Sequence, residues 1–169
     1  MAEPGRGAQL PRLLDFLDTL PQTYAHGDAS PQNLLLPVSE PDTVVVIDWG
    51  FGTLLPVGFD LGQLVAGLAQ AGETDPDELA AIDPVIFEGY VEGLADEGYD
   101  AAASVVRAGF LGSLAVRSAL CTLPLELLPG STAPTAETVD KFVHGLRLAR
   151  VLIDMVAHLQ ANPDRNERS

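Results

Sequence analysis

The stretch HGDASPQNLLL, residues 26–36, decides how this chain of 169 residues is interpreted. Its first part is polar and rich in turn-forming residues, and its last part is a short apolar run. This order predicts a structured loop that enters a short buried strand. A second apolar run, VVVI at residues 44–47, follows a turn and ends abruptly at Asp48, which predicts a second buried strand. The sequence therefore predicts two short strands, one that follows the polar loop and one that ends at Asp48.

Helical periodicity accounts for most of the remaining sequence. Apolar residues recur every three to four positions in residues 11–20, in the segment that starts at Asp60, and in residues 79–96, 101–120 and 135–160. Asp60 is able to cap its helix. The last helix is expected to begin near Pro134, and the tail of residues 162–169 is expected to fray. The predicted fold is α+β and mainly helical, a bundle with a small β ribbon near its start.

Length and composition favour one soluble domain over residues 1–169. The sequence pattern divides it into a segment of loops and short strands at 24–65 and a helical region at 78–161. The single cysteine, Cys121, rules out a disulfide framework and favours the cytoplasm. The longest apolar stretch, residues 110–128, is interrupted by Arg117, Pro124 and Glu126, so no membrane span is expected.

The formal charge of −15 and the pI near 4.2 argue against binding to nucleic acid or to an anionic membrane. A cationic small molecule would suit this field better. Glu88, Glu92, Asp96 and Glu97 form an acidic helix face that is a candidate to meet such a molecule, although charged helix faces are usually only solvated.

The spacing of Asp28 and Asn33 has a chemical use. Phosphoryl transfer requires a base that orients a hydroxyl nucleophile and oxygen ligands that hold Mg²⁺ on the phosphates, and a kinase catalytic loop meets both needs with a His-x-Asp and an Asn after four intervening residues. Asp28 would be the base and Asn33 a metal ligand. A carboxylate at the end of a buried strand is well placed as a second ligand, and here it is Asp48.

The segments HGDASPQNLLL (26–36), VVVIDWGFG (44–52) and VGFDLGQLV (57–65) together resemble the aminoglycoside phosphotransferase (APH) and choline kinase-like family of the protein-kinase-like superfamily. The resemblance in motif and spacing covers residues 24–65. It implies the C-terminal lobe of a protein-kinase-like fold, in which a short β ribbon carries the catalytic loop and the metal-binding Asp. It also implies Mg²⁺ and ATP as cofactors.

The resemblance assigns a role to each matching residue. Asp28 matches the catalytic Asp, and Asn33 and Asp48 match the Mg²⁺ ligands. His26 matches the histidine that structures the catalytic loop. Asp60 matches an Asp at the start of the following helix, whose carboxylate would fasten that loop through backbone N–H groups.

The largest departure from the family pattern lies before His26. A kinase-type fold needs an N-terminal lobe with a phosphate-covering loop and a lysine, and we expect that lobe to be absent. The sequence has no Gly-x-Gly-x-x-Gly, and its only lysine, Lys141, falls in the last predicted helix, where a solvated charge is the expected role. Gly50 also stands where many family members have an acidic residue. This difference is tolerable, because the expected metal ligand is Asp48.

Three functions follow from these observations. The first is the C-lobe of a phosphotransferase that moves a phosphoryl group from Mg²⁺–ATP to a small-molecule hydroxyl, incomplete without an N-lobe. A truncated gene, a mis-called start or a separate chain that carries the lobe would each explain its absence. The second is a non-catalytic remnant that acts as a binding module or self-associates through the uncovered lobe interface. The third is a metal-dependent phosphoester hydrolase built on His26, Asp28 and Asp48, although such two-metal sites generally use more ligands than the loop offers.

Overall fold

The computed structural model describes residues 9–118, 122 and 135–161. Predictions about the start of the last helix near Pro134, the fraying of residues 162–169 and the environment of Cys121 lie outside the described residues. In the described part, no helix is long and apolar enough to cross a lipid bilayer.

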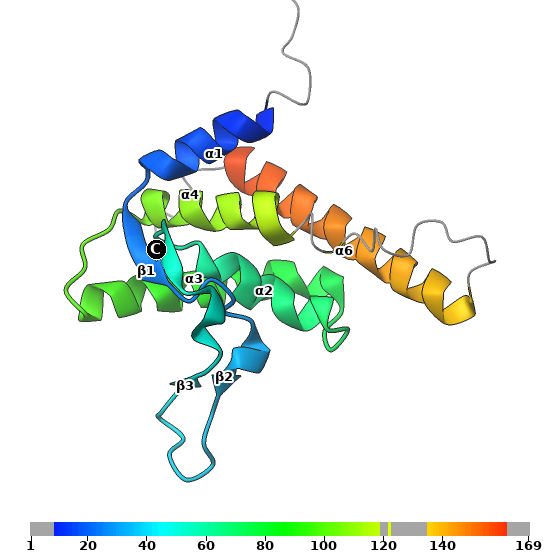
Figure 1. The fold of residues 1–169 in the computed structure, drawn as a ribbon, viewed down its shortest axis with the longest axis horizontal. Coiled ribbons are helices and arrows are strands. Elements are labelled where there is room, and N and C mark those ends of the chain that lie inside the picture. Colours follow the sequence, from blue (N-terminus) through cyan, green and yellow to red (C-terminus); the bar gives the residue numbers. More distant parts are fainter. Residues whose placement is uncertain (1–8, 119–121, 123–134, 162–169) are drawn as a thin grey trace, which may run out of the picture.

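Helices make up most of the structure, as predicted for an α+β chain (Figure 1). The α-helices are α1 (Gln9–Thr19), α2 (Asp60–Gln70), α3 (Leu79–Asp96), α4 (Ala103–Ser113) and α6 (Ala136–Ala161). Three short 3₁₀ turns are η2 (Pro31–Asn33), η3 (Trp49–Phe51) and η4 (Pro76–Glu78), and η5 (Leu114–Ser118) is a π-helical turn that continues α4. The helices predicted at residues 11–20, 79–96 and 135–160 are confirmed within two residues at each end.

The strands form two separate antiparallel ribbons rather than one. β2 (Leu34–Leu35) pairs with β3 (Val45–Val46), as the two apolar runs predict. The other ribbon pairs β1 (Gln22–Ala25) with β4 (Thr53–Pro56), and the sequence did not predict it. In the sequence, β1 directly precedes the predicted catalytic loop and β4 follows the strand end at Asp48, so this ribbon encloses both segments.

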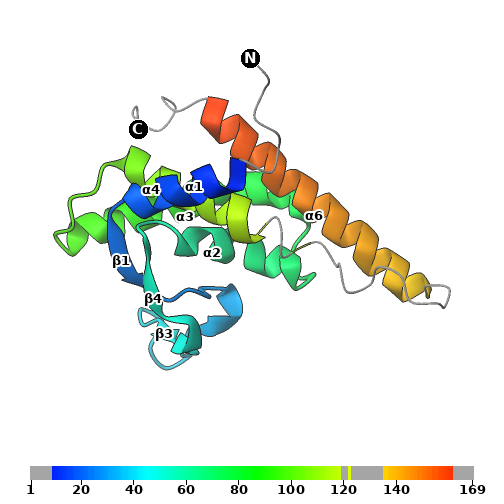
Figure 2. The same ribbon diagram turned by 45° about the horizontal axis from the view of Figure 1, so that its top comes forward.

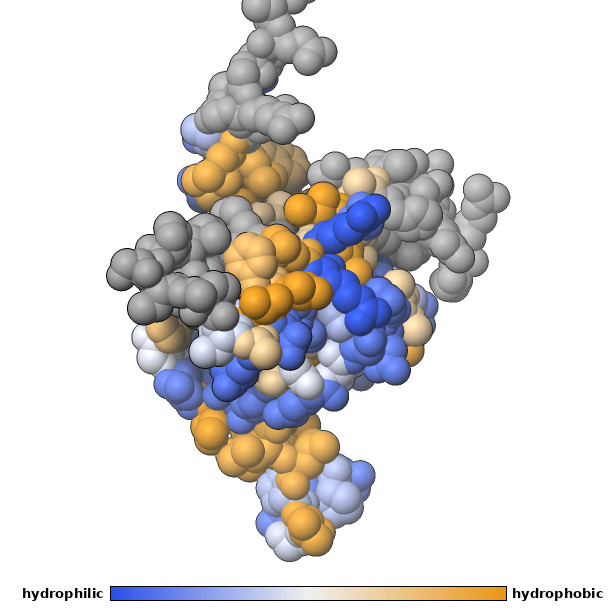
Figure 3. All heavy atoms as spheres, turned by 90° about the vertical axis from the view of Figure 1, so that its right-hand side faces the viewer, coloured by the Kyte–Doolittle hydropathy of each residue, from blue (hydrophilic) through white to orange (hydrophobic). Residues whose placement is uncertain are grey.

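The prediction that the two apolar runs are buried is wrong. The β2–β3 ribbon projects away from the helices (Figure 1), and orange, apolar residues cover much of the projecting part at the bottom of Figure 3. Leu36 is 68% exposed and Val44 is 54% exposed. A two-stranded ribbon buries apolar side chains only where another element covers one of its faces. Here Leu34 and Val46 are half-buried and line the same pocket as Leu64 of α2, whereas the other apolar residues of the two runs are exposed.

Helix α2 lies at the centre of the core. Its apolar face packs against α3, α4, η5 and α6, and α6 runs along the outside of the helices (Figures 1 and 2). The buried core comprises Val57, Leu61, Val65, Ala66, Ala69, Leu79, Phe87, Val106, Phe110, Leu114, Leu148, Leu152 and Met155. Burial of these side chains is the main source of stability.

Helix α1 buries fewer apolar side chains than its apolar periodicity predicts. Leu17 is buried against Gly112 of α4, but Leu10, Leu14 and Phe16 are each nearly half exposed. Part of its apolar face therefore has no partner among the described residues.

Two polar contacts hold helices together within the bundle. Arg107 of α4 pairs with Asp83 of α3 at 2.6 Å, and its guanidinium lies 3.5 Å from the centre of the Phe87 ring. The ring nitrogen Nε2 of His144 in α6 lies 2.7 Å from the carbonyl oxygen of Ala69 in α2. His144 is thus a half-buried helix residue with a structural contact.

Gly67 brings α2 into direct contact with the predicted catalytic loop. A Cβ atom at this position would lie 2.6 Å from Cδ of Pro31 and 3.1 Å from Cβ of Ser30. Both neighbours are stiff, so they leave no room for a side chain. The position of the loop is therefore set by the core helix beneath it.

We predict that Gly67→Ala and Gly89→Ala have opposite effects on the free energy of unfolding. Both glycines lie inside helices, where alanine is favoured by about 0.5–1 kcal/mol. Gly89 has open space around its Cβ position, so this gain should appear in full. At Gly67 the overlap with the loop should cost about 1–3 kcal/mol. Urea unfolding followed by circular dichroism measures both, and a stabilising Gly67→Ala would contradict the contact.

Candidate active site

The loop at residues 26–33 is fastened to the start of α2 by one carboxylate. Oδ2 of Asp60 accepts a hydrogen bond from the backbone N–H of His26 at 2.7 Å, and Oδ1 accepts one from the N–H of Gly27 at 2.9 Å. Asp60 does not cap its own helix, because the N-cap position belongs to Phe59. Both of its oxygens are instead used on the loop.

Gly27 has a conformation that suits this attachment. Its φ is +77°, which residues with a side chain rarely adopt, and a Cβ atom there would overlap the carbonyl oxygen of Phe51. The loop thus passes directly against η3, the turn that follows Asp48.

His26 joins the loop to the end of β3. The side chain is only 4% exposed, and its Nε2 lies 2.7 Å from the carbonyl oxygen of Ile47. Its Nδ1 accepts a hydrogen bond from the N–H of Asp28 at 3.2 Å. Because Nδ1 accepts, the neutral ring carries its proton on Nε2 and donates it to Ile47. The imidazole therefore fixes the distance between the Asp28 backbone and the residue before Asp48.

Asn33 makes the second link between the two segments. Its Nδ2 donates to the carbonyl oxygen of Asp28 at 2.8 Å and lies 3.4 Å from Oδ2 of the same residue. The backbone carbonyl oxygen of Asn33 accepts a hydrogen bond from the N–H of Ile47 at 3.0 Å. These contacts use the amide nitrogen of the side chain and leave its Oδ1 without a donor among the described residues.

Asp48 follows Ile47 in a left-handed conformation, with φ 60° and ψ 56°. It is the one residue other than glycine with a positive φ in the described part of the chain. Its side chain is exposed, and its carboxylate has neither a hydrogen bond nor an ion pair with any described residue. Unusual backbone conformations of this kind are concentrated at functional sites.

Asn33 and Asp48 fit a Mg²⁺ ion by the chemistry of their free atoms. Mg²⁺ binds oxygen ligands and usually takes only one or two from the protein, with water and phosphate oxygens completing its shell. An amide oxygen and a carboxylate, both without partners in the described residues, meet that need. No group of three or more His, Cys, Asp or Glu side chains in the described part of the chain is arranged to hold a metal by itself.

Arg117 is a site residue that the sequence did not reveal. Its Nη2 lies 2.8 Å from Oδ1 of Asp28, although 89 positions separate the two residues. Arg117 belongs to the π-helical turn η5, and such turns are rare and are frequently found at functional sites. The sequence offered no signal for this contact, because Arg117 falls within an apolar stretch that reads as an ordinary helix.

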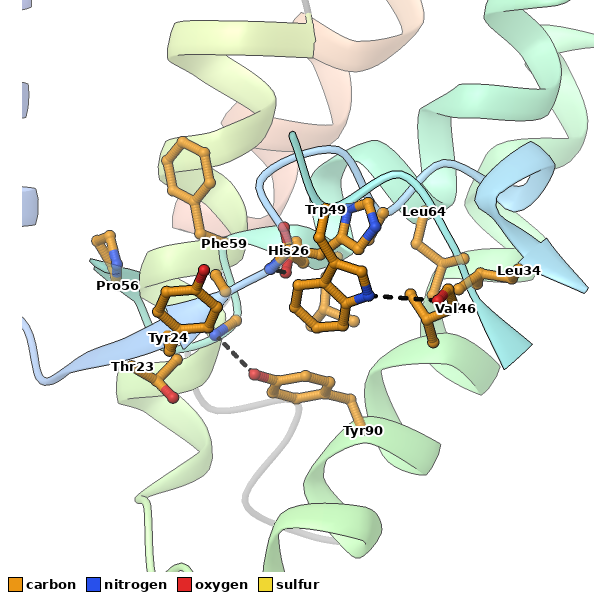
Figure 4. A pocket seen from close by; sticks show the side chains of 15 residues that line it. Thr23, Tyr24, His26, Leu34, Val46, Trp49, Pro56, Phe59, Leu64 and Tyr90 are labelled. Atoms are coloured by element: carbon orange, nitrogen blue, oxygen red, sulfur yellow. Dashed lines mark hydrogen bonds between the residues drawn. The ribbon is translucent and has the colours of Figure 1, made fainter. Parts of the chain in front are cut away.

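A cavity of about 300 Å³ lies on the other side of the loop, next to His26 and Asp60 (Figure 4). Tyr24 and Trp49 stack at one wall with ring centroids 6.2 Å apart, and the Trp49 ring also lies 4.7 Å from that of His26. At another wall the Tyr90 hydroxyl accepts the N–H of Gly58, and burial raises the pKa of this phenol above its ordinary value. The cavity is mainly apolar, with aromatic rings at two of its walls, and Asp28 is not among its lining residues.

We predict that Asp60→Asn lowers the free energy of unfolding by about 1.5–3 kcal/mol, since two hydrogen bonds to a charged acceptor are lost or weakened. Asp96→Asn is the matched control, because Asp96 is an exposed carboxylate at the last residue of α3 and its change should stay within about 0.5 kcal/mol. Urea unfolding measures both. Equal effects of the two substitutions would contradict the role of Asp60 as the fastener of the loop.

Comparison with known proteins gives a family match that includes the segment of the candidate site. The model of the phosphotransferase enzyme family, APH, matches residues 6–103, which is more than half of the chain. The match contains Asp28, Asn33, Asp48 and Asp60, whereas Arg117 lies outside it. No curated protein and no solved structure matches the chain. The match over residues 6–103 shows that this chain belongs to the phosphotransferase enzyme family.

Proposed function

We propose that this chain provides the base and the metal ligands for transfer of a phosphoryl group from Mg²⁺–ATP to a hydroxyl of a small molecule. Membership of the phosphotransferase enzyme family supports phosphotransferase activity in general. The observation that carries the finer proposal is the double link from the loop to Ile47, through the His26 ring and the Asn33 carbonyl. It holds Asp28, Asn33 and Asp48 in one small region.

Asp28 is proposed as the general base. Its backbone is held by His26 and Asn33, so the carboxylate projects from a loop that cannot shift freely. The side chain is 27% exposed, which leaves it accessible to a substrate hydroxyl. A general base needs to reach the proton it removes, and it typically contributes about 10²–10⁴-fold to the rate.

Asn33 and Asp48 are proposed as the residues that hold Mg²⁺. When bound, the ion would neutralise charge on the phosphates of ATP. Asp48 supplies the charged ligand and Asn33 a neutral one. Their mutual position is fixed by the hydrogen bond from the Ile47 N–H to the Asn33 carbonyl, because Ile47 is the immediate neighbour of Asp48.

An ATP-gripping lobe is proposed to cover the exposed apolar residues of the β2–β3 ribbon, which lies at the opposite end of the molecule from α1 (Figure 1). Leu36 is 68% exposed and Val44 is 54% exposed, and apolar patches of this kind mark sites of contact with another protein surface. Lys141 does not serve as the phosphate-binding lysine in this scheme. It pairs with Glu137 one turn away on α6, and both side chains are more than two-thirds exposed.

Two other functions remain alternatives. A non-catalytic binding module would explain the exposed apolar surface, but it gives no reason for the unpaired carboxylate of Asp48 beside Asn33. A hydrolase with a metal cluster at His26, Asp28 and Asp48 has less support, because both ring nitrogens of His26 are engaged with backbone groups. A metal-dependent cleavage of p-nitrophenyl phosphate without ATP would favour the hydrolase.

We predict that Asp48→Asn weakens the binding of Mg²⁺–ATP to this chain by at least about tenfold, whereas Asp28→Asn leaves it within about twofold. Asparagine tolerates the left-handed conformation at position 48, so the fold should persist while the ligand charge is lost. Titration calorimetry with and without Mg²⁺ measures the difference. Equal affinities for the two variants would refute the assignment of Asp48 as the metal ligand.

A further inference from the structure

We infer that the acceptor is a small hydroxy compound with a carboxylate or phosphate group close to the reacting hydroxyl, and that Arg117 binds this anionic group. The inference rests on the proposed function of Asp28 as the base. It starts from the contact between Nη2 of Arg117 and Oδ1 of Asp28 at 2.8 Å, which puts a fixed positive charge directly beside that base.

Arg117 is held in place by a rigid support. The first and last residues of the π-helical turn η5, Leu114 and Ser118, are both fully buried. The Ser118 hydroxyl donates to the carbonyl oxygen of Gly62 in α2 at 3.3 Å, and the side-chain amide of Gln70 lies 3.5 Å from the Ser118 carbonyl oxygen. The turn is thus attached to the same helix whose Asp60 fastens the loop.

The guanidinium has donors to spare. An arginine offers five N–H groups in a planar fork, and among the described residues Arg117 has only the one contact, to Asp28. Its side chain is 28% exposed, so it is partly accessible to a ligand. A carboxylate or phosphate is the group that such a fork binds best, through two parallel hydrogen bonds.

The short distance between Arg117 and Asp28 limits the size of the acceptor. We therefore expect an anionic group on the guanidinium and a hydroxyl at Asp28 to lie close together in the acceptor, separated by about one or two carbons. In the transfer step the hydroxyl oxygen forms a bond to the γ-phosphorus of ATP, and its proton passes to the Asp28 carboxylate. The bond from the γ-phosphorus to the bridging oxygen breaks, and ADP leaves with that electron pair.

Local charge outweighs the net charge of the chain in this argument. The charge of −15 favours cationic molecules at long range, but salt screens such effects beyond about 8–10 Å. Among the described residues, Arg117 carries the one charge that contacts the Asp28 side chain. The other paired cations of the described part bind carboxylates elsewhere: Arg107, Lys141, Arg147 and Arg150.

The test is titration calorimetry of this chain with four probes: D-glycerate, glycerol 3-phosphate, glycerol and choline. We expect at least one of the two anions to bind about tenfold or more tightly than glycerol or choline, and the comparison between the anions separates carboxylate from phosphate. Arg117→Gln should remove this preference, and Arg117→Lys should retain part of it. Arg12→Gln, at an exposed position on α1, should leave it unchanged.

The outcomes separate this inference from the proposed function. Absence of any preference for an anion, a preference for choline, or an anion preference that survives in a folded Arg117→Gln variant would each overturn the inference. Binding of Mg²⁺–ATP is measured on the same sample. If the nucleotide binds and neither anion does, the acceptor class is wrong and the metal site stands. If the anions bind through Arg117 and the nucleotide does not, the acceptor class stands and binding of Mg²⁺–ATP by this chain alone is refuted.

Discussion

The carboxylate of Asp60 is the interaction on which the candidate site depends. Asp60 is the first residue of α2, the helix at the centre of the core. Its carboxylate accepts hydrogen bonds from the backbone N–H groups of His26 and Gly27. These two hydrogen bonds fix the loop on the stable core, although the loop itself buries few side chains. The contact between the His26 ring and the Ile47 carbonyl oxygen then fixes Ile47 and Asp48 relative to the loop.

Much of this arrangement could be predicted from the sequence. The long helices were predictable because their apolar spacing matches the helical period over many residues. Asp28, Asn33 and Asp48 could be named because hydroxyl activation and Mg²⁺ binding restrict both the residue types and their spacing. The structure brings the segments that carry them together through hydrogen bonds, and the roles of these residues remain proposals.

Other features could not be predicted, for physical reasons. β1 and β4 are four residues each and lack an apolar alternation, so only their pairing identifies them as strands. The apolar runs at residues 34–36 and 44–47 predicted buried strands, yet periodicity reports apolar character and not what covers it. The contact of Arg117 with Asp28 could not be predicted, because the two residues lie 89 positions apart and the contact depends on how α4 and η5 pack against α2.

Paramagnetic relaxation by Mn²⁺–ATP in the ¹⁵N-labelled chain tests the central claim most directly, since Mn²⁺ accepts the same oxygen ligands as Mg²⁺. The account predicts that the amide signals of Asn33 and Asp48 broaden first, at Mn²⁺–ATP concentrations that leave those of Glu88 and Glu92 unchanged. Broadening that starts on the acidic face of α3, or that is uniform over the chain, would mean that the ion binds the general negative charge. That result would contradict a metal site at the end of β3.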